Sequence, residues 1–495
     1  MRKYILSIDQ GTTSTRAVLI SKNGELLFKA QRPVNCLYPH PGYVEQDADE
    51  LWISVVDVVN ELLIKSGAKL SEVAAFGITN QRETTILWDK NTGKAIHKAI
   101  VWQSKQTERI CKRYLKDENL IRQKTGLRVN PYFSASKIRY ILEHVKCAEE
   151  KMEKGELLFG TVDSWLIYKL TEGKVHATDI SNASRTLLYN IFERKWDREL
   201  CSLFRINPAC LPKVLDNTAD FGTATFFNCD VPIRGVAGDQ QSALFGQCCF
   251  HEGDSKNTYG TGCFMLMNTG DKPILSKKGL LTTIAWQIDG KVTYALEGSV
   301  FIGGAVVQWL RDEMDWFKES CQSEEYAMRK PDTQGVYFVP AFVGLGTPYW
   351  DDAARGAIFG LTRGADRHNI TRAALYSIAY QSKDVIDLMK KEAGLSLKVL
   401  KVDGGASANS LLMQFQSDIL QCEVSLPKCV ETTALGAAYL AGLGSHFWKD
   451  IEEIEHNHGA KKCFYPSMEE KEAKNLYKGW KAAVKATRVF KVGIK

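Results

Sequence analysis

A short polar turn near the N-terminus has the composition of a phosphate-binding turn. Residues 9–14 read Asp-Gln-Gly-Thr-Thr-Ser, and Arg16 follows two positions later. Gly11 lets the backbone approach a ligand closely, while the Thr and Ser hydroxyls and the arginine can hold phosphate oxygens. Asp9, at the expected strand end, is well placed to hold a magnesium ion, directly or through water. An ordinary β-turn rich in Thr and Ser has the same composition, so this stretch alone leaves both interpretations open.

A similar turn occurs near the middle of the chain. Residues 260–262 read Gly-Thr-Gly between the strand-like runs 257–259 and 263–267, much as the first turn lies between two strand-like runs. We therefore expect two similarly built halves that join near residue 250, with phosphate turns facing each other across a cleft. The Gly-x-x-x-x-Gly-Lys-[Ser/Thr] loop of P-loop NTPases is absent, and the His-Arg-Asp and Asp-Phe-Gly motifs of protein kinases do not occur as a set.

Strands and helices alternate around these turns. An Asn-Gly pair at 23–24 separates the runs 17–20 and 26–28 and is a strong hairpin signal. A strand that ends at Asp239 leads into a helix, and the small apolar segment 433–442 predicts a helix packed closely on a neighbour. At 495 residues the chain is too long for one hydrophobic core. The pattern predicts an α/β protein of at least two domains.

Composition excludes several classes of protein. The formal charge of +6 is small and the basic residues are scattered, which argues against nucleic-acid binding. No run approaches the ~20 apolar residues that cross a bilayer, and the N-terminus lacks the features of a signal peptide, so we expect a cytoplasmic protein without membrane insertion. The 13 cysteines are odd in number and include no Cys-x-x-Cys pair, which favours buried thiols over a disulfide framework or a metal site.

The chain contains, in order, the segments DQGTTSTRA, GITNQRETT, AGDQQSALFGQ, NTYGTGCFMLMNTG and VDGGASAN. With these segments, from residue 4 to about residue 447, the sequence resembles the FGGY carbohydrate kinases of the actin–hexokinase superfamily, and within them the members that phosphorylate glycerol. The resemblance implies two ribonuclease-H-like domains with mixed sheets flanked by helices and a cleft between them. It implies that residues 1–249 bind the polyol and the phosphates and that residues 250–495 bind the adenine nucleotide.

The resemblance also implies roles for individual residues, with ATP and Mg²⁺ as cofactors. The residues implied in nucleotide binding are Thr12, Thr13, Ser14, Arg16, Thr261, Gly304, Gln308, Gly405 and Asn409. Those implied in glycerol binding are Arg82, Glu83, Trp102, Tyr132, Asp239, Gln240 and Phe264. Asp239 would be the base that takes the proton of the phosphorylated hydroxyl. Asp9 and Asp239 would hold magnesium, possibly through water, so base and metal ligand remain competing roles for Asp239.

Donors and acceptors in this set suit a small polyol. Arg82 supplies donors, Glu83 and Asp239 supply acceptors, and Gln240 supplies both. The three aromatic side chains can cover the carbons and leave no room for a full sugar ring. Taken singly, Arg82-Glu83 also fits a surface ion pair, and the aromatic residues also fit an ordinary core.

Two alternative functions remain. One is another FGGY kinase acting on dihydroxyacetone, erythritol or a pentulose. The other, from a different class, is a non-catalytic nucleotide-binding protein of the actin–Hsp70 kind. Relatives are commonly homodimers or homotetramers, which is analogy only.

The chain departs from the family pattern in three places. Tyr140 stands where the family often has Trp, and Tyr376 stands where an acidic residue is usual. Segment 223–230 reads TATFFNCD and lacks both the Arg loop and the phosphorylatable His of regulated relatives. We therefore expect neither sugar-bisphosphate inhibition nor control by phosphorylation at this segment.

Overall fold

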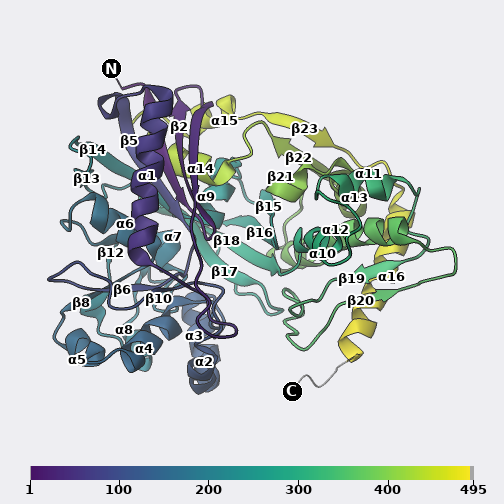
Figure 1. Cartoon of the computed structure of the whole chain (residues 1–495), viewed down its shortest axis with the longest axis horizontal. Helices are drawn as coiled ribbons and strands as arrows, with labels where there is room; N and C mark the ends of the chain where they lie inside the picture. The colour runs from purple at the N-terminus through teal and green to yellow at the C-terminus, as the bar shows by residue number, and fades with distance from the viewer. Residues whose placement is uncertain (1, 491–495) are drawn as a thin grey trace.

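The computed structural model describes residues 2–490, and each half of the chain is built around a mixed β-sheet (Figure 1). The first sheet consists, in spatial order, of β13 (Thr223–Ala224), β14 (Val231–Gly238), β5 (Val73–Asn80), β1 (Tyr4–Gln10), β2 (Ser14–Ser21) and β3 (Leu26–Pro33). Strands β1, β2 and β3 are antiparallel neighbours, whereas β5 and β14 continue the sheet in the direction parallel to β1.

The second sheet repeats this plan. Its spatial order is β17 (Leu281–Ile288), β18 (Lys291–Val300), β16 (Cys263–Gly270), β15 (Ser255–Tyr259), β21 (Val399–Asp403), β22 (Glu423–Pro427) and β23 (Ala460–Phe464). Strands β15, β16 and β18 are antiparallel neighbours, and β21 and β22 run parallel to β15. The expectation of two similarly built halves is confirmed, because β15 and β16 correspond to β1 and β2.

The N-terminal strands form where the apolar runs predict them. The turn between β1 and β2 is closed by a hydrogen bond from the Gly11 N–H to the Ser14 carbonyl, 3.0 Å long. The hairpin between β2 and β3 turns at Gly24, whose φ of 75° lies in the left-handed region that favours glycine. Both predicted turns are confirmed, and the first one presents its hydroxyl-bearing residues at the end of the sheet.

Helices from distant parts of the chain cover the first sheet. Helix α1 (Ala48–Ser66) packs on β2 and β3, while α14 (Thr432–Gly444) packs on β1, β5, β14 and α9 (Asp239–Gly246). Glycines allow this close approach: a Cβ added to Gly436 would lie 1.8 Å from the Ser242 carbonyl oxygen, and one added to Gly77 would lie 2.4 Å from that of Ala437. The predicted close packing of segment 433–442 is confirmed.

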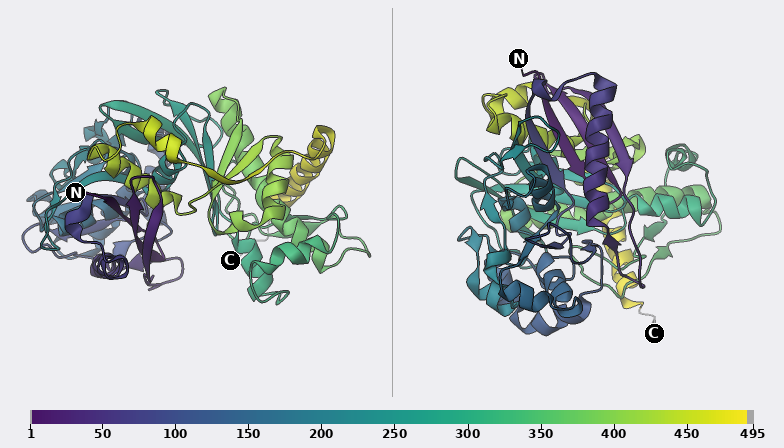
Figure 2. Two further views of the ribbon diagram at one scale, coloured as in Figure 1. Left: turned by 90° about the horizontal axis from the view of Figure 1, so that it is seen from above. Right: turned by 60° about the vertical axis from the view of Figure 1, so that its left-hand side comes forward.

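The two halves share part of their hydrophobic core. One buried cluster contains Ile5 and Val18 of the first sheet, Leu266 and Ala295 of the second sheet, and Leu435 of α14. Figures 1 and 2 show the resulting arrangement, in which two lobes, one around each sheet, are joined where α9 and α14 lie. The lobes are therefore connected by packed side chains as well as by the chain itself.

Helix α12 (Arg367–Ala393) lies against β16 and β18 of the second sheet. On it, the Tyr376 hydroxyl accepts a hydrogen bond of 2.7 Å from Arg372, and the Tyr376 ring stacks on Phe415 with centroids 3.5 Å apart. Tyr376 is thus a partner of Arg372. The other elements of the second lobe are α10 (Ala305–Asp312), α11 (Gln322–Met328), β19 (Tyr337–Val339), β20 (Ala357–Phe359), α13 (Ser410–Leu420), α15 (Ile451–Asn457) and α16 (Glu470–Val489).

A long insertion between β5 and β14 forms the lower part of the first lobe (Figure 1). With the short β4 that precedes it, its elements are β4 (Glu45–Gln46), β6 (Ile86–Asp89), β7 (Ala99–Ile100), α2 (Glu108–Tyr114), α3 (Glu118–Thr125), α4 (Ser134–His144), α5 (Ala148–Glu153), β8 (Leu157–Gly160), α6 (Val162–Leu170), β9 (Ala177–Asp179), α7 (Ile180–Ala183), β10 (Tyr189–Asn190), β11 (Lys195–Trp196), α8 (Arg198–Leu203) and β12 (Lys213–Leu215). This insertion supplies several side chains of the site described below.

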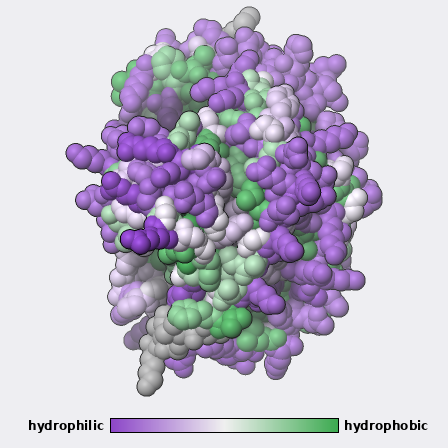
Figure 3. Space-filling model, turned by 90° about the vertical axis from the view of Figure 1, so that its right-hand side faces the viewer, coloured by the Kyte–Doolittle hydropathy of each residue, from purple (hydrophilic) through white to green (hydrophobic). Residues whose placement is uncertain are grey.

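The face of the molecule shown in Figure 3 is largely hydrophilic, with hydrophobic areas between the polar residues. Within residues 2–490, every helix is too short or too polar to cross a membrane.

Candidate active site

The first phosphate-type turn carries a cross-strand ion pair at its base. Asp9 on β1 faces Arg16 on β2, and its Oδ2 lies 3.0 Å from Arg16 Nη1. Asp9 is almost fully buried. Burial, together with the nearby Asp239 carboxylate, raises the pKa of Asp9 to about 6 although Arg16 opposes the rise. A buried carboxylate with a second carboxylate nearby is well suited to bind a cation, because the cation would offset the negative charge.

A tight turn after β5 presents Arg82 and Glu83. Glu83 has a φ of 60°, in the left-handed region that a residue with a side chain adopts rarely. Its carbonyl oxygen accepts hydrogen bonds from Thr85 Oγ1 at 3.0 Å, from Ser134 Oγ at 3.2 Å and from Lys137 Nζ at 3.2 Å. Lys137 Nζ also donates to the Tyr132 carbonyl at 2.5 Å. The buried Lys137 side chain therefore links the turn to the segment that carries Tyr132.

Arg82 is the centre of a buried network of charges. Its Nε lies 3.0 Å from Asp239 Oδ1, and its Nη1 and Nη2 donate to Glu297 Oε2 and Oε1 at 2.7 and 2.9 Å. Arg82 Nη1 also donates to Gln241 Oε1 at 3.3 Å, and Nη2 donates to the Tyr132 hydroxyl at 3.4 Å. All three guanidinium nitrogens thus contact protein oxygens.

Arg185 is the second arginine of this network. Its Nε donates to Glu83 Oε1 at 2.6 Å, and its Nη2 donates to Glu297 Oε1 at 3.2 Å. Burial alone would raise the pKa of Glu297, but Arg185 and Arg82 lower it to about 2. Burial raises the pKa of Glu83 despite the same two arginines. The two arginines and these two glutamates balance in charge, and Asp239 adds one further negative charge.

Asp239 and Gln240 begin α9 at the end of β14. The Asp239 side chain is 30% exposed, whereas the Arg82 side chain beneath it is 2% exposed. Burial raises the pKa of Asp239, and the charges of Arg82 and Lys256 oppose the rise. Lys256 is fully buried on β15 and donates to the Gln240 side-chain oxygen and, at 2.8 Å, to Thr258 Oγ1. Because its oxygen is engaged, Gln240 has its amide N–H groups left for a ligand.

Aromatic side chains connect this polar group to the phosphate-type turn. The Trp102 ring meets those of Tyr132 and Phe264 edge to face, with centroids 5.5 and 6.1 Å apart. The Trp102 indole N–H donates to Thr12 Oγ1 at 2.9 Å. Trp102, Tyr132 and Phe264 thus form an aromatic wall. Because Trp102 also contacts the first turn, the polar group and the turn lie side by side.

The second-half residues gather where three loops meet at one end of the second sheet. The Gly304 N–H donates to the Gly260 carbonyl at 2.8 Å, and a Cβ added to Gly304 would lie 3.8 Å from the Ala406 Cβ. Among residues 2–490, no atom beyond its two chain neighbours lies within 4 Å of a Cβ built on Gly405, so a ligand can approach its backbone closely. Asn409 caps α13, where its Oδ1 accepts from the Leu412 N–H at 2.9 Å.

These loops bring the other residues expected to bind nucleotide close to the second turn. The Gln308 N–H donates to the Gly304 carbonyl at 3.1 Å, and the Gly303 N–H donates to the Thr261 carbonyl at 2.8 Å. Within residues 2–490, none of the hydrogen bonds joins this second-half group to Thr12, Thr13, Ser14 or Arg16. The structure therefore assembles the two sets separately, one on each lobe.

Comparison with known proteins places this architecture in a family. The model of the N-terminal domain of the FGGY family of carbohydrate kinases matches residues 4–246, and the model of its C-terminal domain matches residues 255–445. The chain belongs to the FGGY family of carbohydrate kinases. The resemblance noted in the sequence is thereby confirmed at the level of the family.

Similar proteins extend over the full length of this FGGY chain. It is 56% identical over 497 residues to the glycerol kinase of Bacillus licheniformis, covering 99% of this chain and 100% of that protein. It is 54% identical over 496 residues to the glycerol kinase of Bacillus subtilis, with coverage of 99% and 100%. The crystal structure of Plasmodium falciparum glycerol kinase with ADP has a TM-score of 0.92 and 36% identity, covering 98% of both chains. The predicted two-domain α/β fold is confirmed.

Two charged residues at the centre of this FGGY site were not predicted from the sequence. Glu297 lies within an entirely buried stretch of β18, and Arg185 lies in the loop that follows α7. An acidic residue inside an apolar strand is rarely buried without a partner, so the run Tyr-Ala-Leu-Glu-Gly-Ser-Val held a usable signal for Glu297. Arg185 carries no such signal, because its partners are supplied only by the tertiary structure.

The carboxylates of this FGGY site fit magnesium held together with a nucleotide. Mg²⁺ usually takes one or two carboxylates, with substrate phosphates and water as its other ligands. Asp9 and Asp239 are close enough for the charge of one to raise the pKa of the other. No group of three or more His, Cys, Asp or Glu is arranged to hold a metal ion anywhere in residues 2–490. Asp9 and Asp239 are the carboxylates that would hold such an ion.

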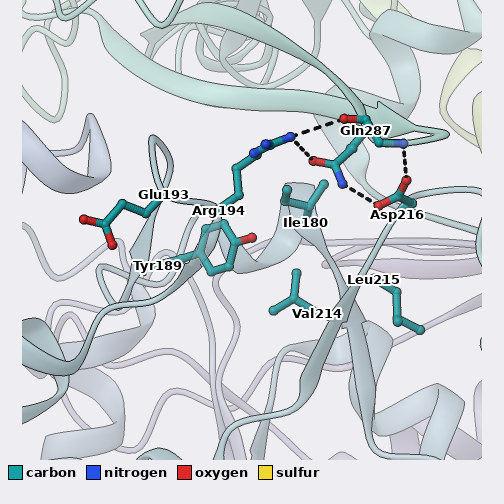
Figure 4. Close-up of a pocket in the computed structure, with 9 residues that line it drawn as sticks. Ile180, Tyr189, Glu193, Arg194, Val214, Leu215, Asp216 and Gln287 are labelled. Carbon is teal, nitrogen blue, oxygen red and sulfur yellow. Dashed lines mark hydrogen bonds between the residues drawn. The ribbon is translucent and has the colours of Figure 1, made fainter.

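A surface pocket of about 390 Å³ lies elsewhere, where the β10–β11 turn approaches the β17–β18 hairpin (Figure 4). Its polar side chains bond to one another: Arg194 Nη1 donates to Gln287 Oε1 at 3.4 Å, and Gln287 Nε2 donates to Asp216. None of the residues predicted to bind polyol or nucleotide lines it. This pocket is separate from the candidate active site.

Proposed function

We propose that this chain is a glycerol kinase, which transfers the γ-phosphoryl group of ATP to a terminal hydroxyl of glycerol and yields sn-glycerol 3-phosphate and ADP. One observation carries the proposal: Arg82 pairs with Asp239 and contacts Tyr132, whose aromatic neighbour Trp102 donates a hydrogen bond to the first phosphate-type turn. Full-length similarity to glycerol kinases supports the choice of substrate.

The polyol site would be small and rich in hydrogen-bonding groups. Arg82 and the free amide of Gln240 donate, Glu83 and Asp239 accept, and Tyr132 and Trp102 cover the carbon chain. The hydrogen bond from Arg82 Nη2 to the Tyr132 hydroxyl, at 3.4 Å, is the longest of the Arg82 side-chain hydrogen bonds, so a substrate hydroxyl replaces it at the least cost. A site built around specific hydroxyls rejects analogues that lack them, because its polar groups would remain unpaired.

Asp239 would act as the general base. Its carboxylate accepts the proton of the terminal hydroxyl while that oxygen attacks the γ-phosphorus, and the bond from the γ-phosphorus to the bridging oxygen of ADP breaks. A bound magnesium ion would neutralise phosphate charge, and Asp9 and Asp239 are the residues that would hold it. The two roles of Asp239 compete for the same oxygens, and Arg82 already occupies the Oδ1 side.

The first turn and the second-half loops would hold ATP from two sides. Thr12, Thr13, Ser14 and Arg16 offer hydroxyls and a charge to the phosphates. The open backbone at Gly405 and the loops at 260–262 and 303–305 would receive the rest of the nucleotide. We accordingly assign polyol and phosphate binding to residues 1–249 and adenine nucleotide binding to residues 250–495, with Phe264 reaching across to the aromatic wall.

We further propose that the protein works in the cytoplasm as a homodimer or homotetramer, without nucleic-acid partners. Light scattering coupled to size exclusion would measure the mass in solution. A single species at the mass of one chain would contradict the oligomer.

A substrate panel tests the proposed function. Purified protein is supplied with ATP, Mg²⁺ and, in turn, glycerol, dihydroxyacetone, erythritol and a pentulose, and ADP release is followed by a coupled assay. We expect the highest kcat/KM with glycerol. A preference for a pentulose or erythritol would assign the site to another FGGY activity. ATP turnover that added glycerol leaves unchanged would favour a non-catalytic nucleotide-binding protein instead.

A further inference from the structure

Glu297 holds Arg82 from a different half of the molecule. It lies on β18 of the second sheet, 215 positions along the chain from Arg82, and its side chain is fully buried. Each carboxylate oxygen accepts from one Nη atom of Arg82, at 2.7 and 2.9 Å. This two-point contact fixes the plane of the guanidinium as well as its position, because a single hydrogen bond would leave the group free to swing.

The same carboxylate also braces the second arginine. Arg185 Nη2 donates to Glu297 Oε1 at 3.2 Å, and Arg185 Nη1 lies 3.1 Å from Glu297 Oε2. Arg185 Nε donates to Glu83 Oε1 at 2.6 Å. Through its two arginines, Glu297 therefore reaches both charged residues of the Arg82–Glu83 turn.

Two sides of the Arg82 guanidinium remain directed at groups of the polyol site. With both Nη atoms held by Glu297, Nε is left beside Asp239 Oδ1 at 3.0 Å, and the outer side of Nη2 is left beside the Tyr132 hydroxyl at 3.4 Å. Arg82 can meet a substrate hydroxyl only on these sides. Glu297 sets the orientation of the Arg82 guanidinium but does not itself contact these two sides of it.

We propose that Glu297 is a positioning residue for polyol binding, whose two-point grip on Arg82 directs the Nε and Nη2 sides of that guanidinium to the substrate. The inference rests on the proposed glycerol kinase function and deepens it. The sequence of residues 1–249 alone does not complete the polyol site, because the group that orients its arginine comes from the second sheet.

Two substitutions separate geometry from charge. Glu297→Gln keeps the size of the side chain but loses its charge and one acceptor. Glu297→Asp keeps the charge but is one methylene shorter, so it cannot reach both Nη atoms of Arg82 at once. If only charge balance mattered, Glu297→Asp would behave as the wild type.

The measurements are kcat, the KM values for glycerol and ATP, and the glycerol affinity by calorimetry without nucleotide. We expect each variant to raise the glycerol KM by about 10- to 100-fold, the usual range for a lost charge-assisted hydrogen bond, and to leave the ATP KM unchanged. Calorimetry should show the same weakening, which a general loss of stability in a folded protein would not produce.

Asp384→Asn is the matched control. Asp384 is another buried carboxylate of the second lobe, and it accepts from Tyr349, Trp480 and Lys481 at 2.8 to 2.9 Å, away from the site. The Asp384→Asn substitution should lower the melting temperature without changing the glycerol KM. An unchanged glycerol KM in both Glu297 variants would overturn the proposal, and so would failure of both to fold, since that would make Glu297 purely structural. If the wild type itself did not phosphorylate glycerol, the proposed function would fail instead.

Discussion

At the scale of single residues, the proposed chemistry depends on how Asp239 is surrounded. Its carboxylate is partly exposed, while the groups behind it are buried. Burial raises its pKa, and Arg82 and Lys256 limit the rise. A general base is most effective when its pKa lies near the working pH. The raised pKa should therefore make Asp239 a better base than a well-solvated carboxylate with an ordinary pKa.

Asp239→Asn tests the role of base. The amide keeps the shape of the side chain but cannot take a proton, so we expect kcat to fall by about 10²- to 10⁴-fold while glycerol still binds. Steady-state kinetics and calorimetric titration with glycerol measure the two effects.

Asp220→Asn serves as the control for this substitution. Asp220 has a largely exposed side chain that pairs with Arg234 at 3.1 Å, so its loss should leave kcat unchanged. Near-normal turnover in Asp239→Asn would remove Asp239 from the role of base.

At the scale of elements, the position of Asp239 depends on how α9 packs against α14. These helices meet through glycines: a Cβ on Gly436 would lie 1.8 Å from the Ser242 carbonyl oxygen, and one on Gly246 would lie 2.0 Å from that of Thr432. The atoms in the way belong to the backbone, which cannot rotate aside as a side chain can. The spacing of α9 from α14 is therefore sensitive to one added methyl group.

Gly436→Ala should destabilise the protein. Overpacking of a close-packed contact typically costs about 1–3 kcal/mol of unfolding free energy, so we expect a lower melting temperature in thermal unfolding. Because Asp239 is the first residue of α9, kcat should fall as well.

Gly364→Ala is the comparison. A Cβ there would meet only the side-chain end of Gln334, at 3.3 Å, and that end can move. A melting temperature for Gly436→Ala equal to that of Gly364→Ala would contradict the importance of the α9–α14 contact.

At the scale of the whole molecule, the two lobes carry different parts of one proposed site. The first turn and the polyol group lie mainly on the first lobe, and the loops at 260–262, 303–305 and 404–408 lie on the second. Hydrogen bonds within residues 2–490 do not link the first turn to these second-lobe loops. A nucleotide whose phosphates touch both would draw the lobes together and exclude water from the reacting groups.

Small-angle X-ray scattering tests this closure. We expect the radius of gyration to decrease when glycerol and a non-hydrolysable ATP analogue are both present. Arg16→Ala, which removes the cation of the first turn, should reduce the change. A radius of gyration that is the same with and without both ligands would contradict closure.

The local parts of this structure were predictable from the sequence. Strand periodicity, the Asn-Gly hairpin and the glycine-containing turns depend on neighbouring residues, so β1, β2, β3, β15 and β16 form where their patterns indicate. The residues of the Arg82–Glu83 turn and Asp239 at the start of α9 were also identified, and the structure brings them together. Chemistry-bearing side chains at strand ends are visible without knowing what they touch.

The tertiary structure alone decided which groups hold those residues in place. Glu297 approaches Arg82 because β18 and the loop after β5 meet across the two halves, and Arg185 reaches both Glu83 and Glu297 from the insertion. A sequence pattern shows the residue types of near neighbours. The energetic contribution of a buried charge depends instead on partners that can lie hundreds of positions away in the sequence. The sequence by itself thus determined which residues could do the chemistry, and the packing of the two sheets determined how they are aimed.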